Sequence, residues 1–207
     1  MIYYGYYADI PRPIVDAFVR EREMGRLVTV NEEGLPHIGL YPFVYTGDVI
    51  ELHVNRGDEQ FADLKAHSRC VFEVDEVLAV IPSYWIHPED AVMATAYHRT
   101  VIFDCDATVS DDAAVLAEQQ TRLLARYQPE GGFRPLTVGD PLYRGAIDHI
   151  RAVRLDIKDR RMKFKLGQNR SVEVRAKVVA ELRKRGRPND THAADALQWT
   201  IDHEVRR

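Results

Sequence analysis

Apolar and polar residues alternate over several short stretches, which is the pattern of strands with one buried face. Strands are predicted over five such stretches, residues 27–30, 36–45, 50–54, 70–74 and 100–109. The first three are joined by short turns and are expected to form a meander. Residues 13–24 and the residues after Asp58, a candidate cap, carry apolar side chains at helical spacing instead, so each predicts a helix. The connection over residues 81–96 is rich in aromatic residues and is expected to pack against the fold.

The second half of the chain adds two strand patterns, at residues 153–157 and 162–166, and several helices. Helices are predicted over residues 110–127, 171–186 and 189–205. The first begins at Ser110 or Asp111, the second is capped by Ser171, and the last has an apolar face that includes Val205.

This order of elements predicts an α+β fold built around an antiparallel barrel of six or seven strands, with peripheral helices and a helical C-terminus. We expect residues 1–170 to form the barrel domain. Residues 171–207 are expected to form a helical extension packed on the barrel or on a dimer partner.

The composition is that of a soluble globular protein, because 45% of the 207 residues are hydrophobic and 29% are charged. Disorder, a collagen-like repeat and a disulfide scaffold are therefore excluded. Cys70 and Cys105 fall in strand-like apolar runs and are expected to be reduced core residues. The sequence has no run of about 18 apolar residues and no signal-peptide pattern, so we expect a cytoplasmic location and no membrane partner.

Charge is distributed unevenly along the chain. Residues 151–187 contain 14 of the 28 Lys and Arg residues and four acidic residues, a local charge of +10, whereas the rest of the chain carries −14. A basic segment of this kind suits a polyanionic partner, either a cofactor phosphate or nucleic acid. The alternatives are that it pairs with the acidic remainder in a dimer or stays solvated.

The common catalytic motifs are absent. No G-x-G-x-x-G, G-x-x-x-x-G-K, H-E-x-x-H, C-x-x-C or G-x-S-x-G pattern occurs, which removes the main support for Rossmann, P-loop, zincin and hydrolase functions. The 8 histidines are dispersed, with no two at the helical i, i+4 spacing, so the sequence predicts no metal site.

Several segments carry a family resemblance. Residues 163–171, Lys-Phe-Lys-Leu-Gly-Gln-Asn-Arg-Ser, are similar to the K-F-K-L-S-Q-N-R signature of the PaiB-like family of FMN-binding negative transcriptional regulators. Residues 83–85 and 95–107 resemble the aromatic loop and the following strand of that family, and residues 25–37 resemble the opening hairpin of the wider pyridoxamine-phosphate-oxidase-like superfamily. The resemblance implies a split β-barrel homodimer that binds FMN at the subunit interface.

Three positions depart from the family pattern. Gly167 replaces the usual Ser, and Ala96 stands where Trp is common, which removes a flavin contact or stacking surface. Gln60 stands where the wider superfamily has a Lys. A member of the family that has lost its FMN is therefore the alternative to a flavoprotein.

The signature residues themselves suit a phosphate. Strand periodicity puts Lys163 and Lys165 on one face, so both ammonium groups can reach a common anion. Gln168, Asn169 and Arg170 follow in the turn before the helix predicted from residue 171, whose free N–H groups also favour an anion. In the alternative interpretation the two amides satisfy backbone groups of the turn and the lysines stay solvated.

Other candidate site residues lie outside the signature. Arg56 follows the third predicted strand, where split-barrel flavoproteins typically place phosphate-binding basic residues, and His53 and Asn55 precede it. Candidates for the ring pocket are Tyr84, Trp85, Tyr97 and His98, and Thr95 is a further candidate for cofactor binding. The alternatives are an ordinary strand-face histidine at position 53 and an apolar cluster under the long connection.

Three functions are compatible with these features. The first is an FMN-binding split-barrel protein of the PaiB-like type, acting as a flavin-dependent oxidoreductase or a flavin-responsive regulator, although the sequence identifies no catalytic acid or base. The second is a transcriptional regulator that binds DNA through the basic helix 171–185, with Arg175, Lys177, Arg183, Lys184 and Arg185. The third is a haem-binding or haem-degrading split barrel with His98 or His53 as the iron ligand.

Overall fold

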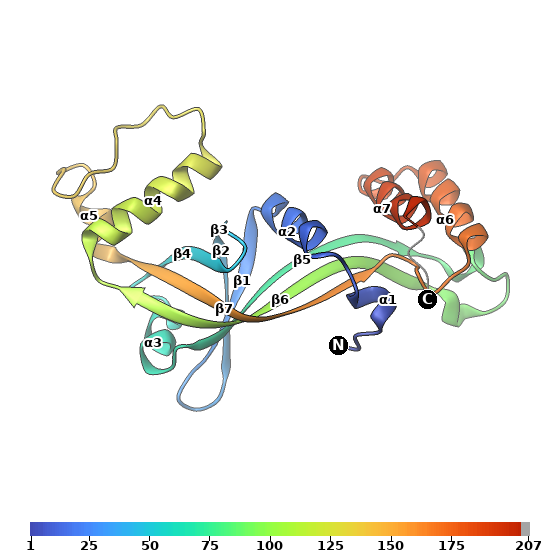
Figure 1. Cartoon of the computed structure of the whole chain (residues 1–207), viewed down its shortest axis with the longest axis horizontal. Helices are drawn as coiled ribbons and strands as arrows, with labels where there is room; N and C mark the ends of the chain where they lie inside the picture. Colours follow the sequence, from blue (N-terminus) through green and yellow to red (C-terminus); the bar gives the residue numbers. More distant parts are fainter. Residues whose placement is uncertain (204–207) are drawn as a thin grey trace. The chain divides into compact units, whose positions relative to one another are not determined.

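The structure is a computed structural model and describes residues 1–203. Seven strands form one antiparallel sheet in the order β2-β1-β5-β6-β7-β4-β3 (Figure 1), which confirms the predicted α+β fold. The strands are β1 (Met24–Val30), β2 (Pro36–Pro42), β3 (Val44–Tyr45), β4 (Val49–Asn55), β5 (Arg69–Ile81), β6 (Thr95–Ser110) and β7 (Ile150–Lys165). The α-helices are α1 (Gly5–Ala8), α2 (Arg12–Glu21), α3 (Glu59–Ala66), α4 (Ala113–Tyr127), α5 (Arg144–His149), α6 (Val172–Arg185) and α7 (Asp190–Asp202), and the 3-10 helices are η1 (Ser83–Trp85) and η2 (Ala91–Met93).

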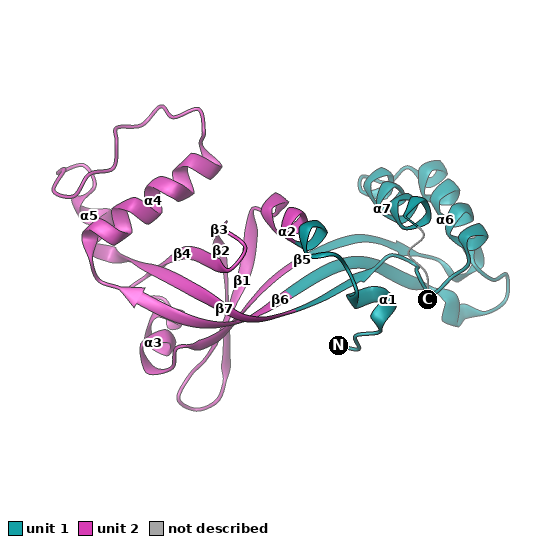
Figure 2. Cartoon of the chain, in the orientation of Figure 1, with its two compact units in different colours: residues 1–15, 75–101, 161–207 teal, residues 16–74, 102–160 magenta. Residues whose placement is uncertain are grey.

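The chain divides into two compact units (Figure 2). Unit 1 contains residues 1–15, 75–101 and the chain from Arg161 onward, and unit 2 contains residues 16–74 and 102–160. Strands β5, β6 and β7 each contribute residues to both units, because the unit boundaries fall within these strands. Helices α6 and α7 belong to unit 1 together with the last residues of β7, whereas a domain boundary at residue 170 stays a sequence-based prediction.

The predicted meander is wrong, because the second predicted strand is divided at Phe43. Its first part, β2, forms a hairpin with β1, whereas its last part, β3, pairs with β4, and β4 pairs with β7. The buried Phe43 ring packs edge-on against Phe72, with 5.1 Å between ring centroids. The Tyr127 hydroxyl accepts a hydrogen bond from the Phe43 N–H at 3.0 Å and lies 2.9 Å from the Phe43 carbonyl oxygen. These contacts replace the sheet partners that the Phe43 backbone loses.

The long strands exceed their predicted lengths. The polar residues between the two apolar runs of β7 predict a break that does not occur, since their side chains find partners while the backbone stays extended. Arg160 Nη2 donates to the carbonyl oxygen of Gly47 at 2.9 Å, and Lys158 Nζ lies 3.6 Å from a carboxylate oxygen of Asp106. Strands β5 and β6 extend through Ile81 and from Thr95, so the long connection is reduced to the residues around η1 and η2.

The cap predictions are mixed. Ser171 accepts a hydrogen bond from the N–H of Val174 at 3.4 Å, and Gly186 ends α6 with a φ of +66°, both as predicted. Helix α4 is capped by Asp112 rather than by Ser110 or Asp111. Asp58 stands at the N-cap position of α3, but its carboxylate accepts from the N–H of Asn55 instead of from the helix.

Each unit has its own apolar core. In unit 2 the sheet residues Leu27, Ile50 and Phe103 are fully buried, and each such side chain stabilises the fold by roughly 1.5–3 kcal/mol. In unit 1 α6 and α7 bury apolar side chains, among them Val178, Leu182, Ala194 and Leu197. Cys70 and Cys105 are buried free thiols, as predicted, and Val205 lies outside the described residues. No helix within residues 1–203 is both long and apolar enough to span a membrane.

Candidate functional site

One cavity of unit 1, of about 660 Å³, brings together part of the predicted site. Strands β6 and β7 and the turn after β7 supply one side of the cavity, and α1 with the segment around η2 supplies the other. Its volume lies within the range of about 300–1,000 Å³ that is usual for small-molecule sites. The predicted site residues that line it are Thr95, Tyr97, Lys163, Lys165, Asn169 and Arg170.

The strand side of this cavity is cationic. Lys163 and Lys165 both line it, which confirms that the two lysines share a strand face, while Phe164 between them is buried. Lys165 Nζ donates to Thr95 Oγ1 at 2.6 Å, and burial, with Lys163 and Arg170 as neighbours, lowers the pKa of Lys165. No carboxylate belongs to the described lining of the cavity. An anion would therefore relieve the repulsion among these cations.

The facing side of the cavity is aromatic. Tyr4 and Tyr6 stack with 5.3 Å between ring centroids, and Tyr7 meets Tyr6 edge-on at 4.4 Å. Lys163 Nζ lies 5.6 Å from the centroid of the Tyr7 ring, a cation–π contact. Burial raises the pKa of Tyr7 and of Tyr97 to about 12, so both phenols stay neutral and can donate hydrogen bonds.

The N-terminal tyrosines are site residues that the sequence prediction missed. The signal that could have found them is four tyrosines within residues 3–7, which is too aromatic for a solvated terminus. Their contribution depends on α1, because this short helix turns Tyr6 and Tyr7 toward the cavity that the strands line.

The turn after β7 contains one residue that stabilises the turn itself and two residues that line the main cavity. Gln168 is buried, and its amide accepts from the Leu166 N–H at 2.7 Å and donates to the Phe164 carbonyl at 2.6 Å. Gly167 has a φ of +80°, which explains Gly at this position, because Ser would be strained there. Asn169 and Arg170 line both the main cavity and a hollow of about 470 Å³ at the N-terminus of α6.

The other predicted residues of unit 1 do not line the main cavity. Trp85 is buried, with the guanidinium carbon of Arg185 4.9 Å from its ring centroid, and Tyr84 is exposed. His98 is half-buried, and its Nδ1 lies 3.1 Å from Thr100 Oγ1. Burial and then the neighbouring cations of β7 lower the pKa of His98, so its imidazole is neutral at pH 7.

Three predicted residues belong to unit 2 and line none of the cavities described here. The Asn55 side chain accepts from the Gly57 N–H at 2.9 Å, so it shapes the turn after β4. His53 is half-buried with a pKa lowered by burial, and its Nδ1 has no hydrogen-bond partner. The Arg56 side chain is exposed.

The basic helix predicted over residues 171–185 corresponds to α6, and fewer of its cations are available to bind DNA than its sequence suggests. Arg175 is buried and donates to the carbonyl and hydroxyl oxygens of Thr200, both at 2.8 Å, so its assignment to a DNA-binding face is wrong. Arg185 forms an ion pair of 2.5 Å with Asp190. Within residues 1–203, no group of three or more His, Cys, Asp or Glu side chains is placed to hold a metal ion.

Comparison with known families identifies the chain. Residues 1–159 match the family described as "Putative FMN-binding domain". The chain belongs to this family. The family match ends before Lys163, so it does not cover the cationic end of β7 or the turn after it. Among proteins with curated descriptions, none matches the chain.

Solved structures share the fold of this FMN-binding domain. The flavocytochrome Anf3 from Azotobacter vinelandii is 17% identical, with a TM-score of 0.64 over 79% of this chain and 72% of that one. The FAD and heme binding protein from Mycobacterium smegmatis is 15% identical, with a TM-score of 0.63 over 79% and 76%. A conserved hypothetical protein, Rv2991, from Mycobacterium tuberculosis is 18% identical, with a TM-score of 0.57 over 83% and 96%. At these identities the likeness shows the split-barrel fold alone.

Proposed function

We propose that the main cavity of unit 1 binds FMN or another phosphorylated flavin. The observation that carries the proposal is the convergence of Lys163, Lys165 and Arg170 on a cavity without a carboxylate, opposite a wall of tyrosines. A flavin phosphate is a dianion attached to a flat aromatic ring, so it needs cations at one end and apolar contacts at the other. The residues present fit such a group.

The chain's own residues would bind and orient this ligand. Lys163 and Arg170 would hold the phosphate, while Lys165, already bonded to Thr95, would fix its position. The tyrosines of α1 would cover the ring and exclude water. A bound flavin supplies electron-transfer chemistry, which suits a flavin-dependent oxidoreductase or a flavin-responsive regulator of the PaiB-like type.

We also infer that the protein is a homodimer. The β1–β2 hairpin exposes apolar side chains on its outer face, and β2 ends the strand order of the sheet. The exposed residues are Met24, Val30, Leu35, Ile38 and Leu40. A patch of this kind favours burial against a second copy of the chain, which light scattering after gel filtration would detect. A regulator that binds DNA through α6 would have Lys177, Arg183 and Lys184 exposed for this contact, because Arg175 and Arg185 are engaged within unit 1.

Titration with FMN and with riboflavin tests the flavin proposal, because the two ligands differ only in the phosphate. We expect the double variant Lys163→Gln/Lys165→Gln to weaken FMN binding at least 10-fold and to change riboflavin binding less than 2-fold. Lys177→Gln, which alters an exposed lysine of the same unit, is the matched control and should leave both affinities unchanged.

Two outcomes would contradict this assignment. If Arg56→Gln weakens FMN binding and the double lysine variant does not, the phosphate is held in unit 2. If neither FMN nor riboflavin binds at 1 mM, the protein is a member of the family without a flavin.

A further inference from the structure

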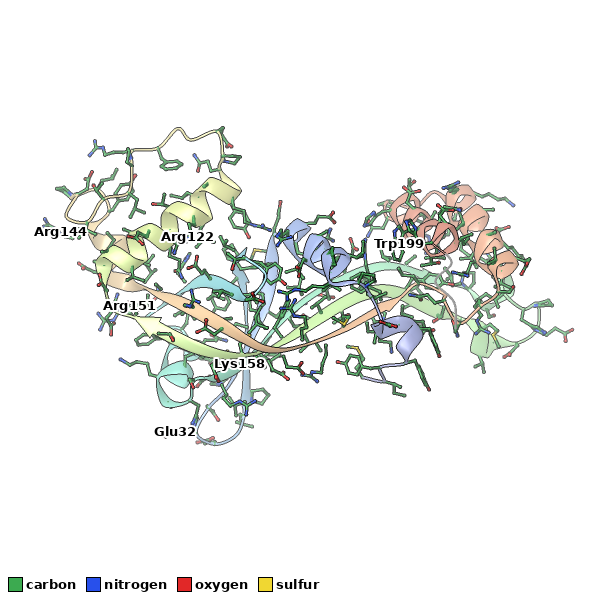
Figure 3. All side chains as sticks on the ribbon, in the orientation of Figure 1. Glu32, Arg122, Arg144, Arg151, Lys158 and Trp199 are labelled. Carbon is green, nitrogen blue, oxygen red and sulfur yellow. The ribbon has the colours of Figure 1, made fainter. Side chains whose placement is uncertain are left out.

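A second cavity of unit 1, of about 610 Å³, lies between the N-terminal segment and α7. Tyr6 and Asp9 line it from the N-terminal side, and Trp199 and His203 line it from α7 and the residue after that helix. Trp199 is labelled in Figure 3. Pro11 and Pro13 complete much of its wall. This cavity is distinct from the main cavity, which is the one proposed to bind a flavin, although Tyr6 lines both.

The aromatic side chains of this cavity are held in place by their neighbours. The rings of Trp199 and His203 stack, with 4.8 Å between centroids and 25° between planes. His203 Nδ1 lies 2.9 Å from the Trp199 carbonyl oxygen, so Nδ1 carries the proton and donates to it. Tyr6 is fixed by its contacts with Tyr4 and Tyr7. Side chains that are already ordered lose little entropy when a ligand arrives.

The charge of the residues that line this cavity is opposite to that of the residues that line the main cavity. Its lining contains one acidic residue, Asp9, and no Lys or Arg among the described residues. Asp9 directly follows α1, and its backbone N–H donates to the Gly5 carbonyl at 2.7 Å, so the residue has a fixed place beside Tyr6. Aromatic faces and a carboxylate both attract cations, and prolines offer apolar contact without a competing charge.

We propose that this cavity binds an organic cation, an ammonium group carried by an apolar or aromatic body. The ammonium group lies near Asp9, and the body packs against Tyr6, Trp199 and the two prolines. The proposal does not rest on flavin binding, because Asp9, the charged residue that would recognise the cation, differs from Lys163, Lys165 and Arg170, whereas Tyr6 lines both cavities.

The experiment compares 2-phenylethylamine with 2-phenylethanol, which has a similar shape but no charge. The full chain is labelled with nitrogen-15, and the indole N–H signals of its 2 tryptophans are followed during each titration. We expect 2-phenylethylamine to shift the Trp199 signal with a Kd of about 1–10 mM, a value usual for so small a ligand. Trp85 is the internal control, because it is buried beneath Arg185.

The variant Asp9→Asn tests the role of charge without disturbing a buried residue, since Asp9 is exposed. We expect it to weaken 2-phenylethylamine binding about 5-fold and to leave 2-phenylethanol binding unchanged. Equal affinities of the amine and the alcohol for the unaltered protein would overturn the proposal, as would a Trp199 signal that does not move at 20 mM amine. Repeating the titration with saturating FMN separates the two sites, because the result is expected to be the same.

Discussion

Asp63 of α3 ties this helix to the β1–β2 hairpin, and removing its carboxylate should destabilise unit 2. The side chain is 5% exposed, and its Oδ2 accepts hydrogen bonds from Thr29 Oγ1 at 2.5 Å and from His37 Nδ1 at 2.8 Å. Thr29 and His37 are cross-strand partners, so one carboxylate binds both strands of the hairpin. Asp63→Ala would leave the Thr29 hydroxyl, which is 1% exposed, without this acceptor.

The expected loss follows from these two bonds. A hydrogen bond to a charged group contributes roughly 1.5–3 kcal/mol, and the two bonds share one oxygen, so we expect Asp63→Ala to lower the free energy of unfolding by about 2–4 kcal/mol. Urea unfolding followed by circular dichroism measures this loss. The matched control is Glu32→Ala, an exposed carboxylate of the hairpin turn (Figure 3), for which a change within about 0.5 kcal/mol is expected.

A double-mutant cycle isolates the contact itself. Thr29→Val removes the hydroxyl and nearly keeps the shape, so the double variant Thr29→Val/Asp63→Ala should lose less stability than the sum of the single variants. If Asp63→Ala behaves like Glu32→Ala, or if the two losses are additive, the carboxylate does not hold the helix on the hairpin.

Three further predictions concern the pKa of a histidine, the turn after β7 and the break between β2 and β3. Burial and then Lys163 hold the pKa of His98 below its usual value, so the unfolded chain takes up the proton first and stability falls as the pH drops below about 6.5. His98→Gln should flatten the decline of Tm measured between pH 7.5 and 5.5. Gly167→Ser should cost about 1 kcal/mol in urea unfolding because of the positive φ, and Gly167→Asn should cost less. Tyr127→Phe removes the hydroxyl that bonds the Phe43 backbone and should cost about 1–3 kcal/mol, with faster hydrogen exchange at the Phe43 amide.

Elements fixed by local signals could be predicted from the sequence. Helix α6 is an example, since Ser171 and Gly186 define its ends through contacts made within a few residues. The division of the second predicted strand could not be predicted, because the Phe43 backbone at the break finds its partner in the hydroxyl of Tyr127, a residue 84 positions away. The continuity of β7 has the same origin, since Arg160 finds its partner at Gly47 in a distant turn. Alternation predicts strands, whereas partners far along the chain decide where the strands break.

The cationic strand face of the candidate site was predictable from the spacing of its residues. Lys163 and Lys165 share a face because a strand has a period of two residues, and the sequence shows this directly. The tyrosine wall comes from the opposite end of the chain, so no spacing rule relates Tyr6 to Lys163. Gln168 is a residue that the sequence assigns to the site although it does not line the main cavity. Its amide binds the backbone of its own turn instead.

The cations of the basic segment, residues 151–187, differ in whether a carboxylate lies beside them. Much of its positive charge is paired with carboxylates of the same unit, in the ion pairs Arg151–Asp111, Arg154–Asp156, Lys158–Asp106, Arg160–Asp16, Arg183–Asp195 and Arg185–Asp190. Lys163, Lys165 and Arg170 differ, because they line a cavity whose described lining has no carboxylate. Holding cations together without counter-charge costs folding free energy, and a bound anion recovers it. We therefore propose that these three cations of the basic segment are neutralised by a ligand, and phosphate binding there should raise Tm.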